Sequence, residues 1–281
     1  MTRSILVSLS GLSSDRAVLQ TAIAAGRIEG GHILALRARI DVVDAAAVLT
    51  VGFPEAHMPI ADSIVRIREE ENSRSRHARD AYDAAMKAVD AGAAGQNRVT
   101  LAWAETTSLF AELIAQARLH DLTVMGRDPE LSPESIRSVL VASGRPLLLA
   151  PPKPGPVIGK TIAIAWKEGA EAARAVTAAE SLLAKAERLF ILAAPEHGRD
   201  EDAAASAKHL AALFAAKGFK AEIRMGEAGG GARAIRNLAY DCDADLLVMG
   251  AYGHSRMREV LLGGVTEAML ADCAIPVFLF H

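Results

Sequence analysis

The stretch "DLLVMGA" at residues 245–251 repeats the stretch "DLTVMGR" at residues 121–127 in five of seven positions. Each copy is an apolar run that ends in glycine, and each is followed by a helix-like segment, a proline and a last apolar run. The other matched runs are "PLLLAPP" from Pro146 with "PVFLFH" from Pro276, and "SILVSL" from Ser4 with "TIAIAW" from Thr161. These three matched pairs predict an internal duplication.

A proline-rich segment, "PPKPGPVIGK" at residues 151–160, lies between the two copies. Its four prolines cannot continue a helix or a central strand, so the segment reads as a linker. A chain of 281 residues is long enough for two domains. We therefore place the domains at residues 1–152 and 157–281.

The second half alternates short apolar strands with amphipathic helices. The expected helices cover residues 169–185, 201–217, 231–240 and 264–272. Strands that are apolar along their whole length and alternate with helices indicate βαβ units and a parallel sheet covered on both faces. The first half repeats this pattern, so the predicted fold class is α/β with two tandem doubly wound parallel-sheet domains. Its exception is a long charged helix, expected from about Pro59 to Gly92, which we interpret as a solvated helix with intrahelical ion pairs.

Composition argues against several classes of function. The net charge is −3, and the 31 basic and 34 acidic residues are mixed along the chain, which disfavours nucleic acid as a partner. The two cysteines, Cys242 and Cys273, have no zinc-ligand spacing and favour the reducing cytoplasm. Asp15 and Arg16 interrupt the apolar start, so we expect a first strand and helix there in place of a signal peptide. We also expect no membrane-spanning helix.

Four glycines lie near the end of the stretch "DLLVMGA" or after it: Gly250, Gly253, Gly263 and Gly264. Gly250 ends a strand, and ligands of doubly wound sheets collect at the carboxyl ends of the strands. Gly263 and Gly264 stand where a helix is expected to begin, and exposed backbone N–H groups at a helix start favour phosphate. The same glycines are also what tight turns require, so the residues alone leave both interpretations open.

The spacing Gly-x2-Gly-x9-Gly of Gly250, Gly253 and Gly263, within "VMGAYGHSRMREVLLGGVTEAMLADCAIPVFLF", resembles the closing segment of universal stress proteins. The tandem arrangement resembles family members with two such domains. The resemblance implies five-stranded, adenine nucleotide alpha hydrolase-like domains that dimerise through their last strands. It also implies bound ATP, accompanied by Mg²⁺, with little or no catalysis.

The resemblance implies one ATP site per chain, between the ends of "TIAIAW" and "DLLVMG". The candidate site residues are Ala165, Trp166, Lys167, Met249, Gly250, Gly253, Gly263, Gly264, Val265 and Thr266. Two of them depart from the family pattern. Gly264 replaces a Ser or Thr hydroxyl, and Lys167 stands where ATP-binding members tend to carry Asp. Lys167 reads either as a phosphate partner or as an ordinary solvated lysine.

The first half has lost the phosphate motif. No second glycine follows Gly126, and 20 positions separate it from Pro146, whereas 26 separate Gly250 from Pro276. Counting back from the prolines sets Pro133 and Glu134 opposite Gly263 and Gly264, which removes one N–H donor and adds a negative charge. We therefore expect the first half to reject nucleotide phosphates.

Three functions are compatible with these patterns. The first is a cytoplasmic regulatory binding protein with one adenine-nucleotide site and no catalytic or metal-ligating residues of its own. The second is an enzyme of phosphoryl or nucleotidyl transfer, and the third is an interaction protein without nucleotide. In each case we expect residues 146–150 to lie near residues 276–280 in an intramolecular pseudo-dimer, because mutual pairing would cover two apolar edges. The family resemblance also allows a homodimer.

Overall fold

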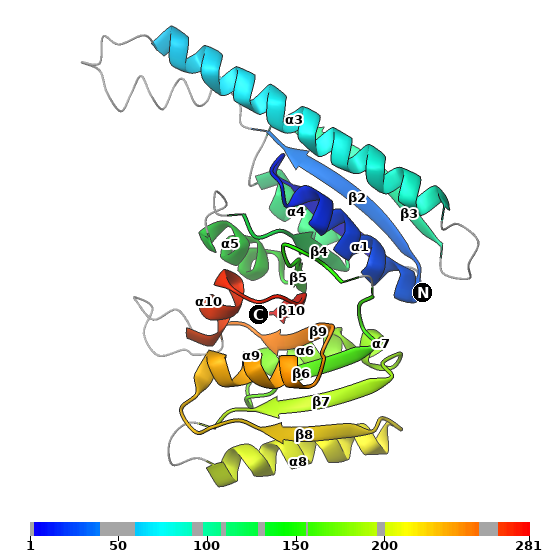
Figure 1. Ribbon diagram of the computed structural model, residues 1–281, viewed down its shortest axis with the longest axis vertical. Coiled ribbons are helices and arrows are strands. Elements are labelled where there is room, and N and C mark those ends of the chain that lie inside the picture. Colours follow the sequence, from blue (N-terminus) through cyan, green and yellow to red (C-terminus); the bar gives the residue numbers. More distant parts are fainter. Residues whose placement is uncertain are drawn as a thin grey trace.

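The computed structural model describes residues 3–39, 60–91, 98–107, 111–128, 133–155, 157–195, 200–252 and 264–281. Within these ranges ten strands form one sheet, in the order β3-β2-β1-β4-β5-β10-β9-β6-β7-β8 (Figure 1). The first half contributes β1 (Arg3–Leu9), β2 (Gly31–Ala38), β3 (Val99–Thr106), β4 (Leu122–Met125) and β5 (Leu147–Leu149). The second half contributes β6 (Thr161–Ala165), β7 (Arg188–Ala193), β8 (Ala221–Met225), β9 (Leu246–Gly250) and β10 (Val277–Phe280).

The two halves of the sheet have the same topology. In each half the third strand lies at the outer edge, followed by the second, first, fourth and fifth, and every pair within a half is parallel. The two fifth strands, β5 and β10, pair antiparallel and join the halves. The predicted fold class, α/β with two tandem doubly wound parallel-sheet domains, is confirmed.

Helices cover both faces of the sheet. One face carries α1 (Asp15–Glu29), α3 (Ile60–Ala91), α6 (Ala170–Ala178), α7 (Glu180–Leu183) and α8 (Asp200–Ala216). The other face carries α4 (Ala111–Leu119), α5 (Pro133–Ser143), α9 (Gly231–Asp241) and α10 (Gly264–Ala271). None of the helices in the described ranges is long and apolar enough to cross a membrane.

The apolar strands are explained by burial on both sides. In β1, Ile5, Val7 and Leu9 belong to the hydrophobic cluster of the first face, whereas Leu6 belongs to that of the second. Because successive side chains of a strand point to opposite faces, a strand between two helical layers must be apolar throughout. This requirement explains why the strand segments are unbroken apolar runs in the sequence.

The aspartate of the repeated stretch has the same role in both domains. The side chain of Asp121 accepts a hydrogen bond from the backbone nitrogen of Ser4 at 2.9 Å. The side chain of Asp245 accepts three, from the backbone nitrogens of Gly159, Lys160 and Thr161 at 2.7–3.2 Å. In each domain this carboxylate ties the start of the fourth strand to the start of the first. Burial raises the pKa of Asp245 above its usual value, and these backbone hydrogen bonds oppose that rise.

The long helix α3 is packed on the sheet and is not a purely solvated helix. It has exposed intrahelical ion pairs, such as Arg79 with Asp83 at 3.2 Å. However, α3 also buries Tyr82 against the first-face core. Glu71 of α3 is 3% exposed and lies 2.9 Å from the guanidinium of Arg37 in β2. The sequence did not indicate that one face of α3 is buried, because Glu71 on that face is charged like the residues on the exposed faces.

Several contacts besides the strand pairing connect the two domains. At the β5–β10 ladder Leu148 lies opposite Phe278, and both side chains are buried. Arg127, which follows β4, donates a hydrogen bond to the carbonyl oxygen of Cys273 in the second domain. Arg3 donates to the hydroxyl of Ser181 at 2.7 Å. The expected contact between residues 146–150 and 276–280 is therefore present, with polar contacts at other points of the junction.

Candidate functional site

The carboxyl ends of β6 and β9 form the candidate site of the second domain. Ala165 of β6 lies opposite Met249 of β9 in the ladder. After these two strands the chain continues to opposite faces, since α6 belongs to the first helical layer and α10 to the second. Such a switch point is where doubly wound sheets bind ligands. The structure thus brings five predicted residues together at the carboxyl ends of β6 and β9: Ala165, Trp166, Lys167, Met249 and Gly250.

Gly250 has a packing role. A β-carbon at this position would lie 2.5 Å from the backbone nitrogen of Ala172 and 2.6 Å from the carbonyl carbon of Glu171, both in α6. The equivalent Gly126 is similar, because its β-carbon would lie 2.6 Å from the hydroxyl of Ser14, just before α1. In both domains the glycine therefore lets the helix after the first strand approach the fourth strand. This packing explains the repeated glycine without a ligand.

The side chains of Trp166 and Met249 are engaged in packing. The indole N–H of Trp166 donates to the hydroxyl of Ser206 in α8 at 2.9 Å, and its ring packs against the first-face core. Met249 is 4% exposed and belongs to the second-face core. Lys167, in contrast, is exposed at the edge of the sheet. Glu168, the next residue, is exposed as well, so two charges of opposite sign lie side by side after β6.

The first turn of α10 lies beside the end of β9. The backbone nitrogen of Tyr252 donates to the hydroxyl of Thr266 at 3.5 Å, and Thr266 is 4% exposed. Gly264 is exposed, and a β-carbon built there would meet none of the described residues within 4 Å. The backbone N–H groups of a first helical turn have no partners within the helix. Gly264 and the half-buried Val265 therefore begin α10 at the switch point, and within the described residues Gly264 is uncovered.

Two predicted residues, Gly253 and Gly263, lie outside the described residues. The candidate site is accordingly defined by the end of β6, the end of β9 and the first turn of α10.

Sequence reasoning missed a cluster around Tyr252. Its hydroxyl donates to Glu267 of α10 at 3.1 Å, and its backbone has a positive φ of 59°. Burial and the nearby charge of Glu267 raise the pKa of Tyr252, so the hydroxyl keeps its proton at neutral pH. The charges of Arg137 and Glu134, both in α5 of the first domain, also act on this hydroxyl. The first domain thus contributes charged groups to the surroundings of the second domain's site.

The equivalent switch point of the first domain is closed by its own side chains. Asp128 accepts hydrogen bonds from the hydroxyls of Ser10, at 3.2 Å, and of Ser14. Asp15 accepts from the backbone nitrogens of Ser10 and Gly11, each at 2.8 Å. Asp15 and Asp128 are 2% and 8% exposed. Burial raises the pKa of Asp15, the hydrogen bonds oppose this rise, and the charge of Asp128 adds to it.

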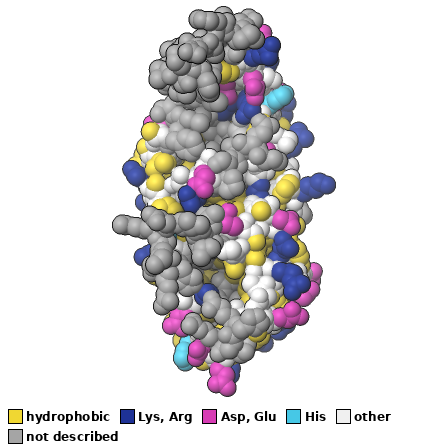
Figure 2. Space-filling view, turned by 90° about the vertical axis from the view of Figure 1, so that its left-hand side faces the viewer, with side chains coloured by type: hydrophobic (Ala, Val, Ile, Leu, Met, Phe, Trp, Pro, Cys, Tyr) yellow, Lys and Arg dark blue, Asp and Glu magenta, His cyan; other side chains and the backbone are white. Residues whose placement is uncertain are grey.

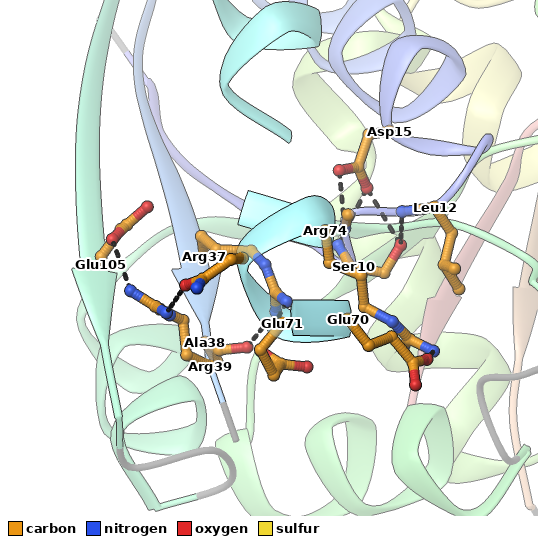
Figure 3. A network of polar contacts seen from close by, with 12 residues as sticks. Ser10, Leu12, Asp15, Arg37, Ala38, Arg39, Glu70, Glu71, Arg74 and Glu105 are labelled. Atoms are coloured by element: carbon orange, nitrogen blue, oxygen red, sulfur yellow. Dashed lines mark hydrogen bonds and ion pairs between the residues drawn. The ribbon is translucent and has the colours of Figure 1, made fainter. Parts of the chain in front are cut away.

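The helix α3 also covers this switch point (Figure 3). A β-carbon at Gly11, whose φ is +77°, would lie 2.5 Å from the carbonyl oxygen of Arg74 in α3. Arg37 lies close by and pairs with Glu71, and the charge of Asp15 also acts on Arg37. The buried carboxylates of Asp15 and Asp128 and the helix α3 therefore occupy the carboxyl ends of the first domain's strands, where a nucleotide would bind. Asp128 could have been found from the sequence, because Asp128 stands two positions after Gly126, as Tyr252 stands two positions after Gly250.

Figure 2 shows the side of the molecule on which α5 and α10 lie in Figure 1. Lys, Arg, Asp and Glu side chains are mixed with hydrophobic ones on this side, beside segments drawn in grey. Within the described part of the chain no group of three or more His, Cys, Asp or Glu side chains could hold a metal ion.

Comparison with known proteins identifies the second domain most directly. The model of the universal stress protein family matches residues 159–281. A universal stress protein of Synechocystis sp. is 33% identical over 93 residues, which are 33% of this chain and 32% of that protein's length.

Comparison with solved structures extends over the whole chain. A universal stress protein from Archaeoglobus fulgidus has a TM-score of 0.70 at 16% identity, and the match covers 100% of this chain and 98% of that one. A structure from Pseudomonas aeruginosa has a TM-score of 0.54 at 20% identity, and covers 99% and 93% of the two chains. Identities this low show the fold alone. Residues 159–281 thus match the universal stress protein family, and the fold of the whole chain, with its two tandem domains, is similar to that of the universal stress protein from Archaeoglobus fulgidus.

Proposed function

We propose that the protein is a non-catalytic binding protein of the stress response whose second domain binds one ATP. The single observation that carries this proposal is the open start of α10 at Gly264, held beside the end of β9 by the contact between Tyr252 and Thr266. The backbone N–H groups of a first helical turn, which have no partners within the helix, and the helix dipole favour a phosphate there. The exposed Lys167 lies at the carboxyl end of β6, next to the exposed Glu168, so its positive charge is partly offset there.

The contrast between the two domains supports one site per chain. In the first domain, Asp15 and Asp128 stand at the equivalent switch point, and Gly11 is covered by α3. Two negative charges about 4 Å apart repel by roughly 4 kcal/mol at an effective dielectric constant near 20. A triphosphate would therefore be rejected there, while the second domain would hold ATP together with its Mg²⁺.

The absence of catalysis is part of the proposal. Backbone donors at a helix start bind the substrate and the transition state about equally, so they do not lower the barrier. We expect phosphate release well below about 1 s⁻¹, the low end of ordinary enzymes.

The proposal is tested by titrating the full chain with ATP in a calorimeter, in wild type and in Gly264→Asp. The new carboxylate should favour the start of α10, so the fold is kept, but it would repel the phosphates. We expect one site per chain in wild type and at least a tenfold loss of affinity in the variant.

The matched control is Ala111→Asp, which adds the same charge at the exposed start of α4 in the first domain. It should bind ATP as wild type does. No heat with wild type would favour a nucleotide-free interaction protein, and two equal sites would contradict the closed first domain. Steady turnover above the stated rate would favour the enzyme hypothesis.

A further inference from the structure

The hydroxyl of Ser10, which follows β1, lies between two buried carboxyl groups of the first domain. Its oxygen is 3.0 Å from the side chain of Asp15 and 3.2 Å from that of Asp128, and these two residues are 2% and 8% exposed. The backbone nitrogen of Leu12 donates to the same hydroxyl oxygen at 3.2 Å (Figure 3). A hydroxyl has one proton to donate, so the hydroxyl of Ser10 can donate to only one of the two carboxyl groups at a time. The other contact needs a proton from the carboxyl group itself.

The two carboxyl groups differ in their other partners. One oxygen of Asp15 accepts a hydrogen bond from the backbone nitrogen of Ser10 and the other from that of Gly11, each at 2.8 Å, and such bonds favour an ionised carboxylate. Among the described residues the partners of Asp128 are the hydroxyls of Ser10 and Ser14. A hydroxyl donates to a carboxylate but can also accept from a protonated carboxyl group. A proton on Asp128 would therefore complete its contact with Ser10, while Ser14 donates to Asp128.

The cations around Asp15 and Asp128 come from β2, α3 and the segment after β4. The charge of Asp15 acts on Arg37 of β2. Each of these cations has another acceptor: Arg37 lies 2.9 Å from Glu71, Arg74 lies 2.5 Å from Glu70, and Arg127 donates to the carbonyl oxygen of Cys273. The positive charges are thus largely offset, so two ionised carboxylates at one hydroxyl would repel each other.

We propose that Asp15 and Asp128 hold one proton between them at neutral pH, and that loss of this proton at higher pH weakens the link between residues 10–15 and the segment after β4. With the proton bound, each contact of the Ser10 hydroxyl has a donor and an acceptor. Without it, two negative charges face one hydroxyl in the protein interior. The pair keeps at least one negative charge at neutral pH, so it still opposes a phosphate. Proton binding here does not require ATP in the second domain, and the two proposals can fail independently.

The shared proton makes folding stability depend on pH in one direction. An aspartate of the unfolded chain loses its proton near about pH 4. In the folded chain burial and the charge of Asp128 raise the pKa of Asp15, against the opposing effect of its hydrogen bonds. The folded pair therefore keeps a proton that the unfolded chain releases. Its contribution to stability is complete below about pH 4 and is lost as the pH rises through the upper pKa of the folded pair.

Infrared spectroscopy of the full chain detects the proton directly, because a protonated carboxyl group has a C=O stretching band that a carboxylate lacks. Folded wild type should show this band at neutral pH and lose it as the pH rises. Asp128→Asn should reduce the band, whereas the control Asp83→Asn, which changes an exposed carboxylate of α3, should leave it unchanged. No band in wild type at neutral pH, or a band of equal intensity in Asp128→Asn, would overturn the inference.

Urea unfolding of the full chain at a series of pH values measures the consequence for stability. In Asp128→Asn the new amide can donate to Ser10 and accept from Ser14, as the protonated carboxyl group does, so the fold should be kept. Relative to this variant, the folding equilibrium constant of wild type should fall by up to about tenfold per pH unit above about pH 4. Asp83→Asn should follow wild type. A difference between wild type and Asp128→Asn that stays constant with pH would also overturn the inference, and if this variant does not fold, the wild-type infrared band decides.

Discussion

Glycine serves two purposes in this duplicated fold, one at Gly126 and Gly250 and another at Gly264. Gly250 ends β9 and Gly126 directly follows β4, and at each a methyl group would collide with the helix that follows the first strand, or with the residue just before it. Gly264, by contrast, is exposed, and its missing side chain leaves open space. The strand-end glycines are therefore required for packing, whereas the helix-start glycine leaves a backbone surface accessible to a ligand.

Replacing these glycines by alanine should separate the two roles. Gly250→Ala should reduce the free energy of unfolding by about 1–3 kcal/mol or more, because its methyl group meets the backbone of α6 and not a movable side chain. Gly264→Ala should change it by less than about 0.5 kcal/mol, since the position is exposed and alanine suits a helix. Urea unfolding of both variants measures the difference, and equal losses would contradict this assignment.

At the scale of elements, α3 differs most from what its sequence suggested. Its 32 residues carry exposed ion pairs, yet it also buries Glu71 against Arg37 of β2, with both side chains 4% exposed. Burial lowers the pKa of Arg37, and the charge of Glu71 opposes this shift. The pair fixes α3 over the switch point of the first domain, so this helix contributes both to the core and to the covering of that switch point.

Removing one partner of this buried pair should cost more than removing both. Glu71→Gln leaves the Arg37 charge buried beside a neutral amide, and a loss of about 3–5 kcal/mol in the free energy of unfolding is expected. The double variant Arg37→Met with Glu71→Leu should lose clearly less, because no buried charge remains. Asp83→Asn, in the exposed pair with Arg79, is the control and should cost less than about 1 kcal/mol. A double variant less stable than Glu71→Gln would rule out this account.

At the scale of the molecule, two parallel sheets become one through a short antiparallel ladder. The three pairs of this ladder join residues 147–149 to residues 277–279, and all six side chains are at most 2% exposed. Either sheet alone would present an apolar edge strand, which is prone to association. The junction is therefore part of the folding unit and not a flexible connection.

Expressed separately, residues 1–152 and 157–281 should not remain as soluble monomers. Mixed or co-expressed, they should form a 1:1 complex, because each half covers the apolar edge of the other. Alone, each should self-associate or aggregate. Size-exclusion chromatography with light scattering measures these masses, and two halves that stay monomeric even when mixed would show that the ladder is dispensable.

The sequence by itself determined the duplication, the order of strands and helices, and the two-layer covering of a parallel sheet. These features follow from apolar runs, helical periodicity and proline and glycine punctuation, which are local and are read within a few residues. The observed helix Gly231–Asp241, for example, differs from the expected 231–240 by one residue. The location of the candidate site was also predictable, because the topology of a doubly wound sheet places it at the carboxyl ends of β6 and β9.

Only the tertiary structure decided which side chains lie at the switch points of the two domains. Asp128 closes the first domain through Ser14, 114 positions away in the chain, and Trp166 is turned into the core by Ser206. The charge of Arg137 in the first domain acts on the pKa of Tyr252 in the second because the two domains pack together. Contacts between residues so distant in sequence leave no local periodicity, because they are selected by the packing of whole helices against the sheet. The sequence therefore predicted the architecture and the loss of the phosphate motif in the first half, whereas the side chains that close the first domain's switch point were decided by the packing of the folded chain.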